Sequence, residues 1–545
     1  MCTLKLDYGF CYGLAGKVRF IESVFAYAKT DFFARPFNQG GHMAQINVQN
    51  LSFSYESSYH NIFENVSFSI DTDWKLGFIG RNGKGKSTFL NLLLGKYEYS
   101  GTIKTDMRFD YFPYVISDTE KTADELSEIW KPGVENWRIL CELNLMDVDA
   151  ELLYRPIRTL SFGERTKVML AVLFSGENDF LLIDEPTNHL DKEAREIIKK
   201  YLASKKGFIL VSHDRDLLDA CIDHVLVLNR STIEVQAGNF SSWWENKEKA
   251  DSFARAENEK HTREIGRLKS AMDRASSWAA KSESTKIGYD PIKEHDRTKN
   301  ARTYISSKTK KMEARAKSFE QRMEKNIEEK EGLLKDVEQI RDLRLTGLTH
   351  YKDRLIECRD LSLQYSDSDT PAFEGLSLEI NQGDRLFLSG KNGCGKSSFI
   401  KAILEGGVSD RYKLTGDLLI APNLVISYIN QDTSMLKGDL RMHAFENKLD
   451  YSQFLAVLRH LDFEQVQFEK KMEEFSEGQK KKVLIATSIM TPAHLYIWDE
   501  PLNYVDVFSR MQLEKLIENY KPTMLIVEHD TKFAEKLATK TCEML

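Results

Sequence analysis

The sequence predicts an α/β chain in which two tandem domains of one design are joined by a long antiparallel helical hairpin. Two observations carry the domain prediction: Gly80–Thr88 fits the pattern G-x-x-x-x-G-K-[ST], and Gly390–Ser398 repeats it. Each copy follows an apolar run typical of a buried strand and precedes a run typical of an apolar helix. The third observation is the segment between the copies, which is dense in charge and nearly free of Gly and Pro.

The repeated glycine-rich pattern predicts a phosphate-binding loop. Its glycines let backbone N–H groups converge on an anion, and the following helix directs its positive end at the same point. The lysine can reach terminal phosphate oxygens, and the next hydroxyl can ligate Mg²⁺. The expected contacts are Gly80, Asn82, Gly83, Gly85, Lys86, Ser87 and Thr88 in the first loop, and Gly390, Asn392, Gly393, Gly395, Lys396, Ser397 and Ser398 in the second.

Further motifs follow both loops in the same order, displaced by about 310 to 316 residues, which indicates an internal duplication. An apolar strand ends in Asp184–Glu185 and, in the second copy, in Asp499–Glu500. Such an aspartate can meet Mg²⁺, and the following glutamate can orient or deprotonate a water. A Ser and a Gly that open an apolar helix offer a hydroxyl, a close N–H and a helix dipole to an anion. These are Ser161 and Gly163, and Ser476 and Gly478.

Composition excludes several classes. The net charge of -7 argues against a chain coated in nucleic acid, although a local basic patch remains compatible with it. No run of about 18 uncharged apolar residues exists, so we expect no membrane span. The 7 cysteines are scattered without a CxxC pair, which favours neither disulfides nor zinc and points to a reducing, cytoplasmic setting.

The motif order resembles the ATP-binding cassette superfamily, and two cassettes without a membrane domain resemble the ABC-F family. The resemblance covers Met43 to the C-terminus and implies cassettes at 43–240 and 351–545 with a helical linker at 241–350. It implies an ATPase with ATP and Mg²⁺ as cofactors. The implied catalytic residues are Glu185, Glu500, His213 and His529; the implied metal ligands are Ser87, Asp184, Ser397, Gln431 and Asp499.

Two of these assignments have plain structural alternatives. Tyr55 and Tyr365 resemble the family's adenine-stacking aromatics, but a strand tyrosine can also be ordinary packing. His213 and His529 resemble switch histidines that contact the γ-phosphate, and a histidine after an apolar strand can also be structural. The family arrangement implies two composite ATP sites, in which Ser476 and Gly478 complete the first site while Ser161 and Gly163 complete the second.

The copies differ where mechanism is sensitive. Gln431 matches the family's Q-loop glutamine, whereas the first copy has Tyr114 at that place. A phenol cannot offer the same carbonyl to Mg²⁺, so we expect the two sites to be unequal. The sequence does not indicate which site is slower.

The stretch between the cassettes carries two apolar stripes at helical spacing, separated by Gly288 and Pro291. Ser270–Lys311, at the expected tip, holds about ten Lys or Arg against about five acids, with aromatics interleaved. A solvated charged spacer is the plain alternative. In the ABC-F family this linker enters the ribosomal E site. The implied contacts with 23S rRNA and P-site tRNA of a bacterial ribosome are Trp278, Lys281, Lys286, Tyr289, Lys293, His295, Arg297, Lys299, Arg302 and Tyr304.

The second copy has EPLNYVD at residues 500–506 where the first has EPTNHLD at 185–191. Within the family, this variant and the long tip look similar to Lsa- and Vga-type antibiotic-resistance members. That resemblance implies protection against lincosamides, pleuromutilins or streptogramin A. The alternatives are a housekeeping translation factor of the family, the motor of a transporter, and a coiled-coil DNA-repair ATPase. We expect a monomer that binds neither membrane nor DNA. Residues 1–42 are expected to be an extension that is disordered or untranslated, with a small accessory arm as the alternative.

Overall fold

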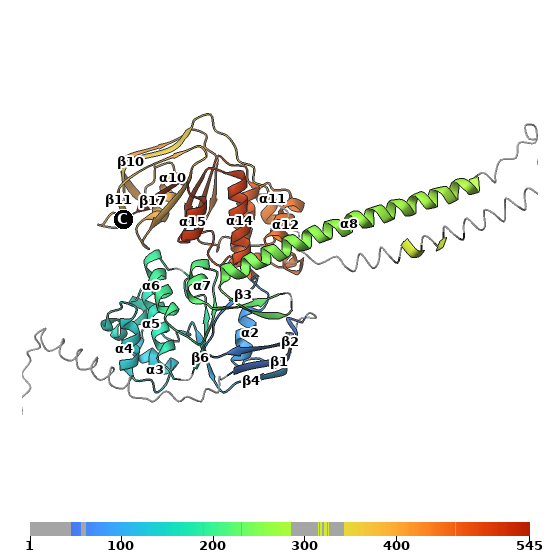
Figure 1. Cartoon of the computed structure of the whole chain (residues 1–545). Helices are drawn as coiled ribbons and strands as arrows, with labels where there is room; N and C mark the ends of the chain where they lie inside the picture. The colour runs from blue at the N-terminus through green and yellow to red at the C-terminus, as the bar shows by residue number, and fades with distance from the viewer. Residues whose placement is uncertain are drawn as a thin grey trace, which may run out of the picture.

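The computed structural model describes residues 45–55, 61–177, 179–188, 190–229, 231–284, 343–463 and 465–544, together with 314, 317–318, 321–323 and 325. Two α/β domains lie against each other, and one long helix projects from the seam between them (Figure 1). The predicted tandem α/β architecture is confirmed. The predicted extension at 1–42 lies outside the described residues.

The first domain is built on a six-stranded sheet with the strand order β5-β6-β7-β3-β8-β9. Its strands are β3 (Lys75–Ile79), β5 (Arg108–Phe112), β6 (Asp179–Asp184), β7 (Phe208–Val211), β8 (His224–Leu228) and β9 (Ile233–Ala237). All neighbours are parallel except β8 and β9. Strands β3, β6 and β7 are apolar and mostly buried, as expected for central strands of a parallel sheet. Their carboxyl ends therefore bring the first phosphate loop and Asp184 to one edge.

A smaller antiparallel sheet and a set of helices complete this domain. The sheet has the order β2-β1-β4, with β1 (Gln45–Phe53), β2 (Phe63–Asp71) and β4 (Ser100–Lys104). The helices are α2 (Lys86–Leu93), α3 (Ala123–Trp130), α4 (Asn136–Asn144), α5 (Phe162–Phe174), α6 (Lys192–Ala203) and α7 (Arg215–Cys221), with short 3-10 turns η1 (Ala150–Tyr154) and η2 (Ile157–Thr159).

The second domain repeats this plan, which confirms the duplication seen in the sequence. Its parallel sheet has the order β14-β15-β16-β12-β17, and its antiparallel sheet the order β11-β10-β13. The strands are β10 (Arg354–Tyr365), β11 (Phe373–Asn381), β12 (Arg385–Gly390), β13 (Tyr412–Ile420), β14 (Ile426–Ile429), β15 (Leu495–Asp499), β16 (Met524–Val527) and β17 (Lys540–Met544). The helices are α10 (Lys396–Leu404), α11 (Leu440–Glu446), α12 (Tyr451–His460), η3 (Gln465–Glu469), η4 (Met472–Glu474), α13 (Glu477–Met490), α14 (Val507–Tyr520) and α15 (Thr531–Leu537).

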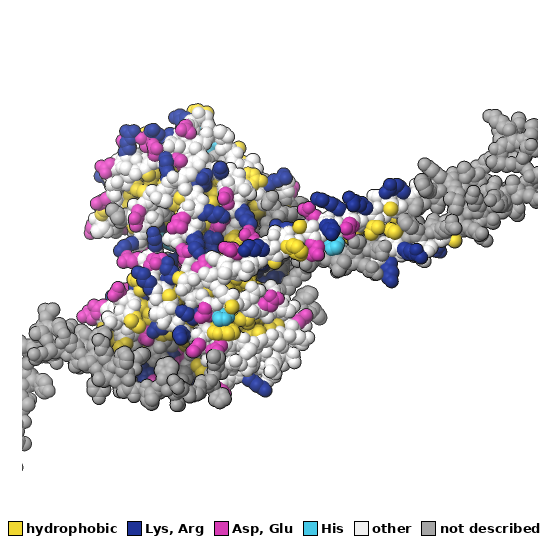
Figure 2. Space-filling model, in the orientation of Figure 1, with side chains coloured by type: hydrophobic (Ala, Val, Ile, Leu, Met, Phe, Trp, Pro, Cys, Tyr) yellow, Lys and Arg dark blue, Asp and Glu magenta, His cyan; other side chains and the backbone are white. Residues whose placement is uncertain are grey.

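The predicted hairpin is described for its first arm, the 45-residue helix α8 (Phe240–Ser284). Most of the second arm and the tip beyond Ser284 lie outside the described residues. Basic and acidic side chains both line the visible part of α8 and also gather along the seam between the domains (Figure 2). Within the described part of the chain, no helix combines the length and apolarity needed to cross a bilayer.

The base of α8 packs on the second domain. Trp243 and Trp244 pack against the Phe508 ring, with centroids 6.2 and 5.9 Å apart, and the Lys247 ammonium lies 4.7 Å from the centre of that ring. Val507 is buried in the core cluster of the first domain. The start of α14 is thus shared between both domains and the linker.

Candidate ATP sites

Each phosphate loop passes into its helix through a glycine in the left-handed region. Gly85 has a φ of 111° and Gly395 a φ of 92°, and a Cβ at either would lie 2.6 Å from a neighbouring atom. The ammonium of Lys86 donates to the carbonyl of Gly80 at 2.6 Å, and that of Lys396 to the carbonyl of Gly390 at 2.8 Å. Both lysines therefore lie folded along the inside of their loops, where a terminal phosphate would be bound.

A hydroxyl and a carboxylate meet beside each loop. Ser87 donates to Asp184 and Ser397 donates to Asp499, both over 3.1 Å. Burial raises the pKa of both aspartates, and the serine hydrogen bonds oppose that shift. Hydroxyl and carboxylate oxygens are ligands that Mg²⁺ prefers, so this donor set fits the ion that the motif implies.

In the first domain, the glutamate after the aspartate lies against His213, the expected switch histidine. The Glu185 carboxylate is 3.3 Å from Nε2 of His213. Burial, followed by the charge of Asp184, raises the pKa of Glu185 to about 8. Burial lowers the pKa of His213 well below its ordinary value, so the imidazole is neutral at pH 7. A carboxyl group with a pKa of about 8 is mostly protonated at pH 7, and it becomes able to take a proton from water as the pH rises through that value.

In the second domain, two side-chain amides contact the glutamate carboxylate in addition to the histidine. Gln431 donates to the Glu500 carboxylate at 2.7 Å and Asn503 donates to the same oxygen at 2.6 Å. His529 is more distant, with Nε2 3.8 Å from Glu500, and burial lowers its pKa to about 4. Burial raises the pKa of Glu500 too.

Both glutamates have a left-handed backbone, with φ of 52° at Glu185 and 47° at Glu500. A non-glycine residue in this region costs roughly 1–3 kcal/mol, and such residues cluster at functional sites. Their amides still donate to the neighbouring strand, at 2.8 Å to Val211 and 3.0 Å to Val527. The strand end is therefore fixed while the carboxylate is turned out of the regular pleat.

The two expected adenine tyrosines are anchored alike. Tyr55 shares a 2.9 Å hydrogen bond with the hydroxyl of Thr88, and Tyr365 donates to Ser398 at 3.0 Å. Each ring also meets a second tyrosine edge-on, Tyr97 at 5.7 Å and Tyr412 at 6.2 Å between centroids. Neither Tyr97 nor Tyr412 was predicted from the sequence, because both stand outside every motif.

Tyr114 follows β5 as Gln431 follows β14, which agrees with the alignment of the copies. Its hydroxyl, however, donates to Asp110 at 2.6 Å, and its ring stacks on Trp130 at 5.1 Å. A different phenol, that of Tyr111, donates to Asp184 at 3.1 Å. Tyr111 thus contacts the site although no motif in the sequence indicated it.

The two domains meet across both loops. Asn82 of the first loop donates to the carbonyl of Tyr504 at 2.8 Å, and a Cβ on Gly478 would lie 3.3 Å from that same Asn82 amide. On the other side, Lys391 of the second loop pairs with Glu193 of α6 at 2.8 Å. Ser161 and Ser476 cap α5 and α13. We call α5 and α13, the two helices capped by these serines, the signature helices. The structure therefore places the second signature helix, α13, beside the first loop, as the composite arrangement requires.

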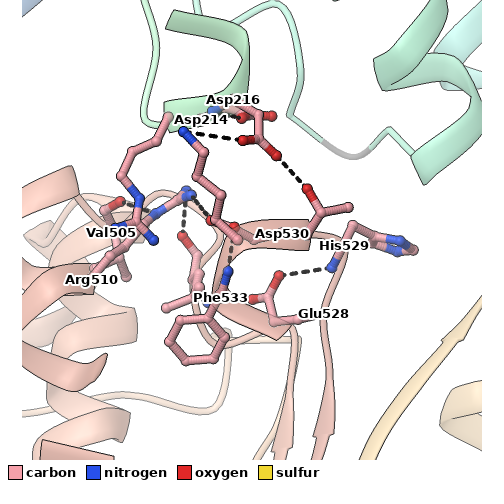
Figure 3. Close-up of polar contacts among 12 residues, drawn as sticks. Asp214, Asp216, Val505, Arg510, Glu528, His529, Asp530 and Phe533 are labelled. Atoms are coloured by element: carbon pink, nitrogen blue, oxygen red, sulfur yellow. Dashed lines mark hydrogen bonds and ion pairs between the residues drawn. The ribbon is translucent and has the colours of Figure 1, made fainter. Parts of the chain in front are cut away.

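Polar pairs also join the two regions that follow His213 and His529 (Figure 3). Lys532 pairs with Asp216 at 3.3 Å and with Asp219 at 2.6 Å, and Thr531 donates to Asp216. Arg215 forms a buried ion pair with Glu514. These contacts link α7 to α14 and α15 at the centre of the seam.

The expected ribosome contacts fall mostly outside the described residues. Trp278 and Lys281 belong to α8. The other eight, Lys286, Tyr289, Lys293, His295, Arg297, Lys299, Arg302 and Tyr304, lie outside the described residues.

Comparison with known proteins agrees with this geometry. The family model described as ABC transporter matches residues 63–188 and 373–503. The ribosome protection protein VmlR of Bacillus subtilis is 27% identical over 89% of this chain and 84% of its own. ABC transporter F family member 2 of Arabidopsis thaliana is 23% identical over 92% of this chain and 76% of its own. A solved archaeal ribosome recycling factor, aABCE1, shares the fold with a TM-score of 0.57 at 18% identity, covering 91% of this chain and 87% of that one.

The fold, the duplicated loops and the matched segments define a tandem ATP-binding cassette ATPase. Over about nine-tenths of its length the chain is similar to ABC-F proteins.

Proposed function

We propose that this ATPase binds the bacterial ribosome in its ATP-bound, closed state, enters the E site and rearranges the peptidyl-transferase centre through its linker. The observation that carries the proposal is the closed pairing of each phosphate loop with the opposite domain, with α8 projecting from the seam. The likeness to a ribosome protection protein supports the partner. The expected outcome in the cell is protection against lincosamides, pleuromutilins or streptogramin A.

In the proposed cycle, each ATP joins the two domains. The loop lysine and the capping serine of the opposite domain would hold the terminal phosphate from two sides. Mg²⁺, held by Ser87 with Asp184 and by Ser397 with Asp499, would neutralise phosphate charge. Glu185 and Glu500 would accept a proton from the attacking water. Hydrolysis removes the anion that both domains share, so the domains part.

Ribosome and nucleotide are coupled if both prefer the closed state, since each then raises the affinity for the other. Contact between α8 and α14 offers a physical route, because Phe508 lies two residues after Asp506, whose charge acts on Lys86 of the first loop. The monomeric chain contains all parts of this cycle.

Replacing Gly288–Lys299 with a short Gly/Ser turn tests the role of the tip. Drug protection is expected to disappear, because the replacement removes five of the ten residues that would contact RNA, namely Tyr289, Lys293, His295, Arg297 and Lys299. Basal ATP hydrolysis is expected to stay within about twofold, a barrier change of about 0.4 kcal/mol, because both ATP sites lie in the cassettes. Growth of a susceptible bacterium across drug classes and phosphate release by the purified chain are the measurements. Retained protection would favour a plain spacer, and a collapse of basal hydrolysis would assign the linker to holding the cassettes together.

A further inference from the structure

The two signature helices differ at the fifth residue after their capping serines. In α5 this residue is Thr166, whose hydroxyl donates to the carbonyl of Phe162 at 3.0 Å, within its own helix. In α13 it is Lys481, which is 2% exposed. A buried ammonium is costly unless its donors are satisfied, so the contacts of Lys481 indicate what it does.

The ammonium of Lys481 spans two segments of the second ATP site. It donates to the carbonyl of Asn430 at 3.0 Å and to that of Asp499 at 3.2 Å, with the carbonyl of Gln431 at 3.5 Å. Asp499 ends β15, and the other two residues begin the loop after β14. One side chain therefore ties the glutamine loop to the strand that carries the acidic pair.

A second contact from the same helix holds the same loop. Glu477, one turn before Lys481, accepts a hydrogen bond from Thr433 at 2.5 Å. Loop 430–433 is thus attached to α13 at both of its ends. Burial lowers the pKa of Lys481, while Glu528, Asp499 and Glu500 oppose that shift.

The position of this loop decides where the glutamine amide lies. Gln431 reaches the Glu500 carboxylate at 2.7 Å, and a displacement of about 1 Å would break a hydrogen bond of that length. In the first domain, the corresponding Tyr114 is fixed instead by Asp110 and Trp130. The dependence on the signature helix therefore differs between the two sites.

We propose that Lys481 is a positioning residue of the second ATP site: it holds loop 430–433 against the end of β15, so that Gln431 faces Glu500. This rests on the proposed role of Glu500 in activating water. It makes the second site, but not the first, depend on a buried lysine of its own signature helix. In this role Lys481 takes no part in the reaction itself and determines only how the Gln431 amide is oriented relative to the Glu500 carboxylate.

The test compares Lys481→Met, Lys481→Thr and Lys481→Arg in the full-length chain, with and without Glu185→Gln, which leaves turnover to the second site. We expect kcat for ATP to fall at least about tenfold in the Met and Thr variants while KM changes less than about twofold, since misplacement rather than lost binding is the cause. Lys481→Arg keeps a cationic donor and is expected to restore most of the rate. Thr166→Val in a Glu500→Gln chain is the matched control and is expected to stay within about twofold.

The decisive readout is the combination with Gln431→Ala. If Lys481 acts through Gln431, adding Lys481→Met to Gln431→Ala lowers kcat no further; multiplied losses overturn the proposal. A raised KM at unchanged kcat also overturns it. Hydrogen exchange of the 430–433 backbone amides measures the mobility of the loop independently of ATP turnover. Exchange should be faster in Lys481→Met than in the parent chain, and unchanged exchange counts against the proposal. A chain that fails to bind ribosomes leaves all these measurements intact, so failure of the ribosome proposal is told apart from failure of this one.

Discussion

Replacing Glu185 and Glu500 together by glutamine is expected to lower ATP turnover by about 10²–10⁴-fold, the usual contribution of a general base, while ATP binding is retained. Glutamine has nearly the same shape but cannot take up a proton. Both carboxylates lie at the end of a buried strand beside the proposed Mg²⁺ ligands, and burial raises the pKa of each. Binding is expected to survive because the loop lysines and Asn82 do not depend on either carboxylate for their contacts.

The double variant is expected to remain on ribosomes when ATP is present, since the closed state can no longer be left through hydrolysis. Sedimentation of ribosomes with ATP and phosphate release by the purified chain measure the two effects. The single variants serve as controls, and their residual turnover ranks the two sites. The sites differ in that the Glu500 carboxylate accepts hydrogen bonds from the amides of Gln431 and Asn503. Unimpaired turnover in the double variant would remove both residues from water activation.

Much of the fold and the loop chemistry could be predicted because it lies in contiguous motifs. A glycine-rich loop between an apolar strand and a helix specifies its own geometry. The structure places each lysine inside its loop and each serine on the aspartate at the strand end. The period of the duplication then indicated a second, equivalent domain. These predictions rest on local physics that a single sequence contains.

Side-chain direction outside the motifs could not be predicted. Tyr114 stands at the place of a glutamine, yet its hydroxyl lies on Asp110, while Tyr111 reaches Asp184. Which of two nearby phenols faces a site depends on packing against Trp130, which is distant in the sequence. Lys481 is likewise one of three consecutive lysines, and nothing in that run indicates which would be buried.

For the interface between the domains, the sequence predicted which motifs face each other but not the individual side-chain contacts. The composite sites follow from the family pattern, but the Arg215–Glu514 pair and the Trp243, Trp244 and Phe508 cluster do not. Such contacts depend on how two separately folded surfaces meet. The periodicity of apolar residues indicates which face of a helix is buried, but it does not indicate which other element packs against that face.

Lys482→Met is expected to lower the free energy of unfolding of the second domain by about 3–5 kcal/mol, because it breaks a buried ion pair from one side. Lys482 contacts Asp506 at 2.6 Å, and the two side chains are 3% and 0% exposed. Burial alone would raise the pKa of Asp506, but Lys482 and the amide of Ser509 hold that pKa well below its usual range. After the substitution, a carboxylate that favours its charged form would stay buried without its cation.

The effect has a pH signature. A depressed folded pKa stabilises the domain above the unfolded value, which for Asp is about 3.9, and this stabilisation is lost as the pH falls through the folded value. Lys482→Met should therefore lose less stability than the parent chain on acidification below about pH 4. Denaturant unfolding at pH 7 and at lower pH measures both quantities. Lys167→Met, at the corresponding place in α5 where the lysine is partly exposed, is the matched control.

Replacing both partners, Lys482→Met with Asp506→Leu, is expected to recover part of the lost stability, because no uncompensated buried charge remains. Recovery is expected to be incomplete, since Asp506 also caps α14 by accepting from Ser509 at 2.9 Å, and a lost cap costs roughly 0.5–2 kcal/mol. Equal losses in Lys482→Met and Lys167→Met would show that burial of the pair is not what stabilises the domain. A double variant less stable than Lys482→Met by more than the cap can explain would show that the Asp506 carboxylate is held mainly by contacts other than Lys482.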